Sequence, residues 1–433
     1  MSVLVIFIAF VLMLAMMLFG LPIAVAMAAV GIVGGMLAYG IPFMDSIAPV
    51  IWGVQNDNLL TAIPLFVLMG EVLLRSGVAD RTYGALAAWL GWLPGGLLHT
   101  NIGCCAMFAA TSGSSVATAA TVGTVALPSL QARGYPNNLS LGSLAAGGTL
   151  GILIPPSVNM IVYGSITDTS IGQLFIAGIV PGLMLTALFM LYILLVSLRG
   201  TSAPKEIRMP LPERVRLLLD LIPPLVIFLT VMGSLYLGIA TTTESAALGV
   251  SASLFFAWRN ARLRWSVLKV CFLQTARTTG MILLIITSAF VLNLAMSLTG
   301  VADAMTRWVA SLGLSATQML LILMLFYLLL GMFMDVMSML VATVPITFPL
   351  VTALGVDPVW YGVFIVLMCE LGMITPPVGM NLFVVHGIRP DSGGIHDAIR
   401  GGLPYAAIML LFAVLLIALP ELVTWLPAQT RPY

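Results

Sequence analysis

The sequence predicts an all-α integral membrane protein with an inverted-topology repeat, two re-entrant hairpins and two transmembrane helices broken by Pro-Pro pairs. Hydrophobic residues make up 61% of the 433 residues and charged residues only 8%, whereas soluble domains contain about 25% charged residues. Residues 82–132 contain no Asp, Glu, Lys or Arg, and a single span needs only roughly 20 apolar residues. The ten-residue alternation of outer-membrane barrels is absent. These observations exclude a soluble enzyme, and the net charge of +1 argues against a nucleic-acid partner.

The repeat appears as motifs that recur 221 to 223 residues further along the chain. SGVAD at 76–80 recurs as TGVAD at 299–303, and GxxxPP recurs at Gly151 and Gly372. Further pairs follow in the same order, namely Pro128 with Pro349, Gly134 with Gly355, and Asp168 with Asp391. Such ordered self-similarity is typical of transporters built from two related halves.

The elements follow from the hydrophobic runs and the repeat. The first half, residues 1–200, is expected to contain spans 2–19, 22–40 and 58–74, an inner arm 77–94, a hairpin at about 101–128, a broken helix 138–166 and span 179–199. Residues 201–220 form a cytoplasmic linker. The second half, residues 221–433, is expected to contain spans 221–237, 243–257 and 270–298, an outer arm 300–314, a hairpin at about 321–349, a broken helix 358–387 and span 403–424.

The positive-inside rule orients these spans. The loops 199–216 and 259–269 carry five and four basic residues, and two spans separate them. Both loops therefore face the cytoplasm, which turns the second half upside down relative to the first. Both termini become periplasmic, and Arg307 and Arg431 are the only basic residues left outside. The N-terminus lacks a basic region and a cleavage site, so we expect a retained span and not a signal peptide.

Each hairpin region is too long for one span, too short for two, and polar at its centre. The first tip is Ser112 to Ser115, and the register of 221 places residues 333–336, FMDV, opposite it. Irregular backbone at membrane depth is tolerated where it is buried in protein or lines a cavity. The Pro-Pro pair that follows each hairpin ends one half-helix and starts another, which frees carbonyl groups for cations and helix N-termini for anions. Candidate oxygen ligands for a hard cation are Ser112, Ser114, Ser115, Asn159, Thr375 and Asn381.

For several single residues the sequence allows both a functional and a structural interpretation. Asp335 and Glu370 lie near bilayer depth, where ionisable groups are functional candidates, but structural pairing of either is an alternative. Glu244 fits the start of a helix. The four cysteines fit small core residues, and the three histidines fit packed or interfacial positions better than catalytic ones.

Six motifs carry a family resemblance: LPIAVAM (21–27), SGVADR (76–81), SGSSVATAATVG (112–123), GILIPPSVNMIVYG (151–164), ATTTESAALGV (240–250) and ELGMITPPVGMNLFV (370–384). Over nearly the whole chain the sequence resembles the large membrane subunit of the tripartite ATP-independent periplasmic (TRAP) transporters. The resemblance implies a sodium-coupled importer of an organic acid in the bacterial inner membrane, not an enzyme. It also implies an elevator-type, ion-transporter-superfamily-like fold, no organic cofactor, and two partners: a separate small four-helix membrane subunit and a periplasmic substrate-binding protein.

The resemblance also implies site residues, by position. The first Na⁺ site would contain Ser112, Gly113, Ser114, Ser115, Gly151, Pro155 and Asn159. The second would contain Met334, Asp335, Gly372, Thr375, Pro376 and Asn381, and since its tip has little hydroxyl content, its ligands would be mainly carbonyls. Substrate would bind between them, at Ser115, Pro156, Ser157, Asp335 and Pro377.

Three other functions are alternatives for a sequence of this kind. A stand-alone symporter of Na⁺ and a divalent anion would use similar hairpins without a binding protein. A membrane-embedded protease needs a nucleophile and base, or an Asp pair, at one depth, and the residues do not supply one. The third alternative is a channel, but two inverted hairpins are more typical of a transporter that works by alternating access.

Overall fold

The computed structural model describes residues 3–200 and 209–429, and this part of the chain is helical without a β-strand. Five of its helices are long and apolar enough to cross a bilayer when the helical run Leu211–Tyr236 is counted as one. Up to seven spans result if two bent helix pairs each count as one. The all-helical, membrane-type fold predicted from the sequence is therefore confirmed. Residues 201–208 of the predicted linker 201–220 lie outside the described residues, as does Arg431.

The first half contains ten helices among its described residues. They are α1 (Val3–Leu18), α2 (Ile23–Tyr39), α3 (Pro42–Gln55), α4 (Ala62–Arg75), α5 (Val78–Leu90), α6 (Leu97–Ser112), α7 (Ser115–Ala132), α8 (Asn137–Leu153), α9 (Val158–Thr167) and α10 (Ile171–Leu198). The second half contains α11 (Leu211–Leu217), the 3₁₀ helix η1 (Leu218–Leu221), α12 (Ile222–Tyr236), α13 (Thr242–Arg259), α14 (Trp265–Leu298), α15 (Val301–Ser311), α16 (Ala316–Gly331), α17 (Val336–Ala353), α18 (Pro358–Met373), α19 (Met380–Gly387), α20 (His396–Ala418) and α21 (Glu421–Ala428).

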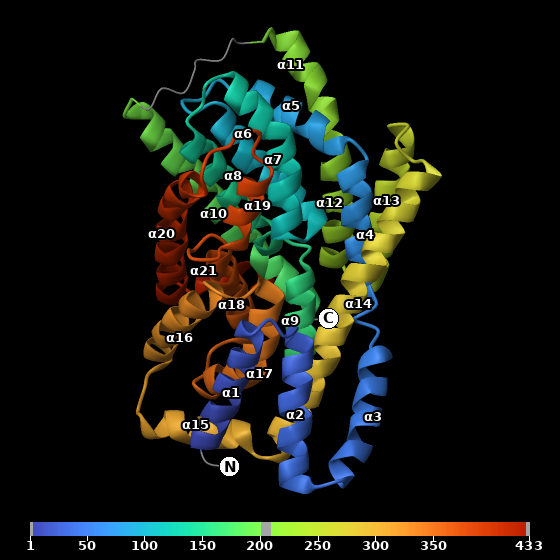
Figure 1. The fold of residues 1–433 in the computed structure, drawn as a ribbon. Helices are drawn as coiled ribbons and strands as arrows, with labels where there is room; N and C mark the ends of the chain where they lie inside the picture. The colour runs from blue at the N-terminus through green and yellow to red at the C-terminus, as the bar shows by residue number, and fades with distance from the viewer. Residues whose placement is uncertain (1–2, 201–208, 430–433) are drawn as a thin grey trace.

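The order of elements from α4 to α10 recurs from α14 to α20. In each set a helix passes through a sharp turn into a short arm, followed by a helical hairpin, a broken helix and a further helix. The two sharp turns use the glycines of the recurring SGVAD and TGVAD motifs, Gly77 at φ +71° and Gly300 at φ +68°, a conformation that glycine adopts without steric cost. Arms α5 and α15 lie at opposite ends of the molecule (Figure 1).

Two segments differ from the predicted spans. Residues 42–55, which lie between the predicted spans 22–40 and 58–74, form α3. This helix is too short to cross a bilayer, and it buries Phe43 and Ile47 against Val291 and Ala295 of α14. The span predicted at 403–424 is present as α20, His396–Ala418, which is long and apolar enough to cross a bilayer but ends earlier than predicted. The chain leaves the helix between Ala418 and Glu421, so α20 and α21 are separate helices.

The helices that surround the hairpins are tightly packed. A Cβ atom added to Gly31 of α2 would lie 2.9 Å from Leu292 Cα of α14, so the two helix backbones are nearly in contact. With 34 residues, α14 is about 51 Å long at 1.5 Å per residue, and it follows α2 along the molecule (Figure 1).

The four cysteines are free and buried, which confirms their interpretation as core residues. Glu244 forms a capping box with Thr241 at the start of α13, which confirms its role as a helix-start residue.

Candidate functional site

The first hairpin turns at the polar residues that the sequence singled out. Helix α6 ends at Ser112, Gly113 adopts φ +60°, and Ser114 caps α7 by accepting a hydrogen bond from the Ala117 N–H at 3.4 Å. Ser112 Oγ lies 2.6 Å from Thr118 Oγ1, which ties the two arms of the hairpin together. A left-handed glycine followed by a capping serine is the local chemistry that stops one helix and starts the next.

The first broken helix lies directly against this tip. Helix α8 ends at Leu153 and α9 starts at Val158, with a cis peptide bond between Pro155 and Pro156. A Cβ atom on Gly151 would lie 2.8 Å from the Ser114 carbonyl oxygen, and one on Gly113 would lie 3.2 Å from the Pro156 carbonyl oxygen. Hairpin tip and helix break are therefore in backbone contact, and that contact requires glycine.

The second hairpin and second broken helix repeat the arrangement with other residues. Asp335 caps α17, accepting hydrogen bonds from the Ser338 N–H at 3.1 Å and from the Ser338 hydroxyl. The break between α18 and α19 contains a second cis Pro-Pro bond, at Pro376 and Pro377. The Val378 N–H donates to the Met332 carbonyl at 3.2 Å, so this tip also contacts its own break. The backbones of Gly331 and Gly372 meet so closely that a Cβ on Gly372 would lie 2.6 Å from Gly331 Cα.

A cavity of about 530 Å³ lies where the two tips and the two breaks converge. Residues of both hairpins and of the helices beside both breaks line it, together with the start of α2 and the middle of α14. The lining residues are Pro22, Ile23, Ala24, Ser114, Ser115, Val116, Ile152, Asn159, Met281, Leu284, Ile285, Asp335, Val336, Met337, Ser338, Met373 and Met380. Asp335 is the only ionisable residue in this lining.

Five helices begin at the cavity wall. The first residues of α2, α7, α17 and α19 are among its lining, and α9 contributes its second residue, Asn159. The N–H groups of a helix's first turn have no intrahelical partner and carry the positive end of the helix dipole. Helix N-termini consequently favour bound anions, and here they converge without an arginine, lysine or histidine in the lining.

The structure brings only part of the predicted site residues to the cavity. Ser114, Ser115, Asn159 and Asp335 line it. The others lie outside the lining: Ser112, Gly113, Gly151, Pro155, Pro156, Ser157, Met334, Gly372, Thr375, Pro376, Pro377 and Asn381. Ser338 and the lining residues of α2 and α14 were missed by sequence reasoning. For Ser338 a signal existed, since it is the third residue of a helix whose cap, Asp335, had been singled out.

Two predicted cation ligands have other partners. Thr375, in the break after α18, donates its hydroxyl proton to the Leu371 carbonyl of α18 at 2.6 Å. Asn381, assigned to the second site, donates from Nδ2 to the Ala145 carbonyl of α8 at 3.2 Å and lies beside the first hairpin. Several buried side-chain atoms of the described residues have no hydrogen-bond partner, and four of them belong to the helix breaks or their neighbours: Ser157 Oγ, Asn159 Nδ2, Glu370 Oε2 and Asn381 Oδ1. Such atoms are the groups that ions and ordered water satisfy.

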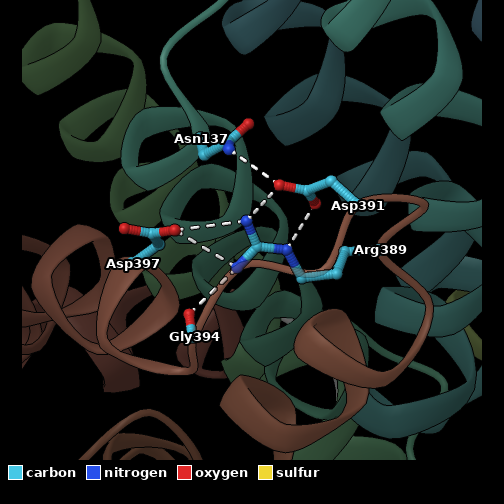
Figure 2. Close-up of polar contacts among 5 residues, drawn as sticks. All are labelled: Asn137, Arg389, Asp391, Gly394 and Asp397. Atoms are coloured by element: carbon cyan, nitrogen blue, oxygen red, sulfur yellow. Dashed lines mark hydrogen bonds and ion pairs between the residues drawn. The ribbon is translucent and has the colours of Figure 1, made fainter.

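An ion-pair cluster joins the two halves beyond the cavity. Figure 2 shows Arg389, in the loop between α19 and α20, pointing between two carboxylates. Its side chain is 3% exposed and donates to Asp391 at 2.5 and 2.6 Å, to Asp397 at 3.2 Å and to the Gly394 carbonyl at 2.9 Å. Asn137, at the start of α8, donates to Asp391 at 3.0 Å. The cluster thus fixes the end of the second broken helix to the start of the first.

This cluster should stabilise the protein in a pH-dependent way. The hydrogen bonds and charge of Arg389 lower the pKa of Asp391 from its ordinary value of 3.8. The stabilisation is therefore present above that ordinary pKa and is lost as the pH falls through the lowered one. Asp391→Asn should reduce the free energy of unfolding at pH 7 by roughly 1 kcal/mol, the upper end for partly exposed pairs.

Thermal unfolding of the purified protein from pH 7 to pH 3 tests this expectation. The difference between the Asp391→Asn variant and the unmodified protein should shrink below about pH 4. Asp168→Asn is the matched control, since Asp168 holds the equivalent repeat position at φ +53°, where Asn is tolerated. A constant difference across the whole pH range would mean that Asp391 does not stabilise the protein as an anion.

Comparison with known proteins places the chain among membrane transporters. The family model of the tripartite ATP-independent periplasmic transporter, DctM component, matches residues 10–422. The C4-dicarboxylate TRAP transporter large permease protein DctM of Pseudomonas aeruginosa is 36% identical over 88% of this chain and 89% of its own length. The isethionate TRAP transporter permease protein DctMQ of Oleidesulfovibrio alaskensis is 33% identical over 94% of this chain and 63% of its own length. The Alcanivorax borkumensis YdaH transporter has a similar fold, with a TM-score of 0.62 at 16% identity over 88% of both chains.

Proposed function

The chain belongs to the DctM family, the large permease component of TRAP transporters, and from this premise we propose that it is the membrane subunit of a sodium-coupled organic-acid importer. The convergence of helix N-termini from both halves on one cavity carries the proposal. These N-termini offer N–H groups to an anion, and the serine, asparagine and aspartate oxygens beside them offer ligands to a hard cation. One cavity can thus hold an anion and cations as neighbours.

Coupling follows from this proximity. Cations held at the hairpin tips attract an anion in the same cavity and so raise the affinity of the cavity for it. By thermodynamic linkage, the bound anion raises the affinity for the cations by the same factor. Asp335 is the only ionisable lining residue and is acidic, so an anion would be repelled unless cations neutralise this charge. The cavity is therefore suited to binding substrate together with Na⁺.

We assign the movement to an elevator mechanism. Each hairpin tip is in backbone contact with its own helix break. Hydrogen bonds from Asn137 to Asp391 and from Asn381 to the Ala145 carbonyl link the two halves, so these elements form one body. The remaining cavity wall comes from α2 and α14, which pack closely against each other. Movement of the hairpin body along this wall would carry the cavity from one side of the membrane to the other.

The substrate class is an organic acid, such as a dicarboxylate, a keto acid or a sialic acid. Relatives are named for C4-dicarboxylates and for isethionate, both of which are small organic anions. We propose a bacterial inner-membrane location with both termini in the periplasm, a small four-helix membrane subunit, and a periplasmic binding protein that delivers substrate. The longer DctMQ relative supports the membrane partner, since this chain covers 63% of it.

Uptake into proteoliposomes tests the proposal. A panel of radiolabelled organic acids would be offered under an inward Na⁺ gradient, with and without the small subunit and the binding protein. We expect uptake that requires the gradient and both partners. Uptake by this chain alone would indicate the stand-alone symporter, and uptake of all acids without any gradient would contradict sodium coupling.

A further inference from the structure

The two halves are also joined by one hydrogen bond at the cavity wall. Ser115, the first residue of α7, donates from its hydroxyl to Glu370 Oε1 of α18 at 2.6 Å, although 255 residues separate them in the sequence. Glu370 is 0% exposed and does not line the cavity, whereas Ser115 does. Ser115 is the one hydrogen-bond partner of this carboxyl within the described residues, and Oε2 has none.

The position of the Ser115 hydroxyl is fixed from two sides. Its backbone lies against Gly151, where an added Cβ would be 2.9 Å from Ser115 Cα. Its side chain is held by Glu370. A serine hydroxyl has one proton and two lone pairs, so when the proton is directed at a sealed carboxyl, only lone pairs remain to face the cavity. An oxygen in this orientation can bind a cation in the cavity but cannot at the same time donate a hydrogen bond to a substrate carboxylate there.

The equivalent positions of the second half lack this contact. The register of 221 residues relates Ser115 to Val336, which has no hydroxyl, and Glu370 to Thr149. Thr149 donates to the Ala146 carbonyl of its own helix at 2.6 Å. At the second hairpin the Ser338 hydroxyl donates to Asp335 of the same hairpin. A hydroxyl–carboxyl contact between the two halves is therefore found at the first hairpin and makes the two predicted cation sites chemically different.

We infer that Glu370 is a positioning residue for cation binding at the first hairpin: by accepting the Ser115 proton, it presents the Ser115 oxygen to the cavity as a cation ligand. The inference rests on the proposed sodium coupling and adds the reason why this hydroxyl serves Na⁺ and not the organic acid. It also gives the second half a direct contact with the first cation site. Loss of the acceptor frees the hydroxyl to rotate and lowers cation affinity, with the substrate contacts left in place.

The test is the Na⁺ concentration for half-maximal uptake in proteoliposomes that contain the complete transporter. Glu370→Met keeps the length of the side chain but removes the acceptor, and should raise this concentration up to about tenfold. Glu370→Gln keeps an acceptor oxygen and should restore a value close to that of the unmodified protein. Ser115→Ala should raise it, and the double variant Ser115→Ala with Glu370→Met should raise it no further, because the two residues act as one unit.

Thr149→Val is the matched control, a buried hydroxyl at the equivalent repeat position, and should leave the Na⁺ requirement unchanged. If Glu370→Met does not accumulate, Glu370→Thr replaces it, since that side chain is polar but too short to reach Ser115. An unchanged Na⁺ requirement in the Glu370 variant, or additive effects in the double variant, would overturn the inference. Uptake that is independent of Na⁺ in the unmodified protein would instead refute the proposed function.

Discussion

Gly151→Ala and Gly372→Ala should each reduce sodium-driven uptake by more than about tenfold, a loss that corresponds to about 1.4 kcal/mol. The added Cβ at residue 151 would lie 2.8 Å from the Ser114 carbonyl oxygen, and at residue 372 it would lie 2.6 Å from Gly331 Cα. Both neighbours are backbone atoms, so no side chain can rotate away. Overpacking of this kind typically costs about 1–3 kcal/mol, and it can be relieved only by moving a hairpin away from its helix break.

The separation of hairpin and break would affect transport more than folding. The surrounding helices α2 and α14 keep their own contact at Gly31 and Leu292, and the oxygens of the tips would simply lie too far from the break to share one cation. We therefore expect normal expression and membrane insertion of both variants, with uptake lost at all Na⁺ concentrations that can be tested.

Gly280→Ala in α14 and Gly233→Ala in α12 are the controls, because a Cβ at either position meets no atom within 4 Å. Alanine at these helical positions should stabilise the helix by up to about 1 kcal/mol and leave uptake unchanged. Normal uptake by the Gly151→Ala variant at normal expression would show that tip and break can separate without consequence, and the predicted first cation site would then be wrong.

The sequence could locate the hairpin tips because their chemistry is local and occurs twice. The register of 221 residues pairs Ser114 with Asp335, and the structure makes each of them the N-cap of the hairpin's second helix. Capping needs only a short side-chain oxygen and the three residues that follow, so it can be recognised in sequence. Gly77 and Gly300 were located in the same way, at the two turns into the arms.

The rest of the site depends on contacts that no local pattern contains. Ser115 meets Glu370 only after the chain has folded, and the cavity wall from α2 and α14 consists of ordinary apolar residues. The direction in which a side chain points also could not be predicted from the sequence. Thr375 was a candidate ligand by residue type, yet it donates its proton to the Leu371 carbonyl. Helix α3 was missed because a short helix with one apolar face resembles a connecting loop between two strongly hydrophobic spans.

The two sodium sites stay predictions that only measurements on substituted residues can test. Among the oxygens of the second site, Asp335 is decisive, since it both caps α17 and lines the cavity. Its two roles can be separated by substitution. Asp335→Asn keeps a side-chain oxygen for the Ser338 N–H and removes the negative charge, whereas Asp335→Ala removes both.

Asp335→Asn should leave thermal stability nearly unchanged and lower uptake at moderate Na⁺ concentration by about tenfold or more, because a charged ligand contributes more to cation binding than a neutral amide. Asp335→Ala should show the same loss of uptake and a further loss of about 1 kcal/mol in stability, the usual cost of removing an N-cap. Asp357→Asn is the control, since Asp357 caps α18 through the Trp360 N–H at 2.8 Å and does not line the cavity. If Asp335→Asn transports with an unchanged Na⁺ requirement, the carboxylate acts only as a helix cap, and the cations at the second hairpin must be held by backbone carbonyls alone.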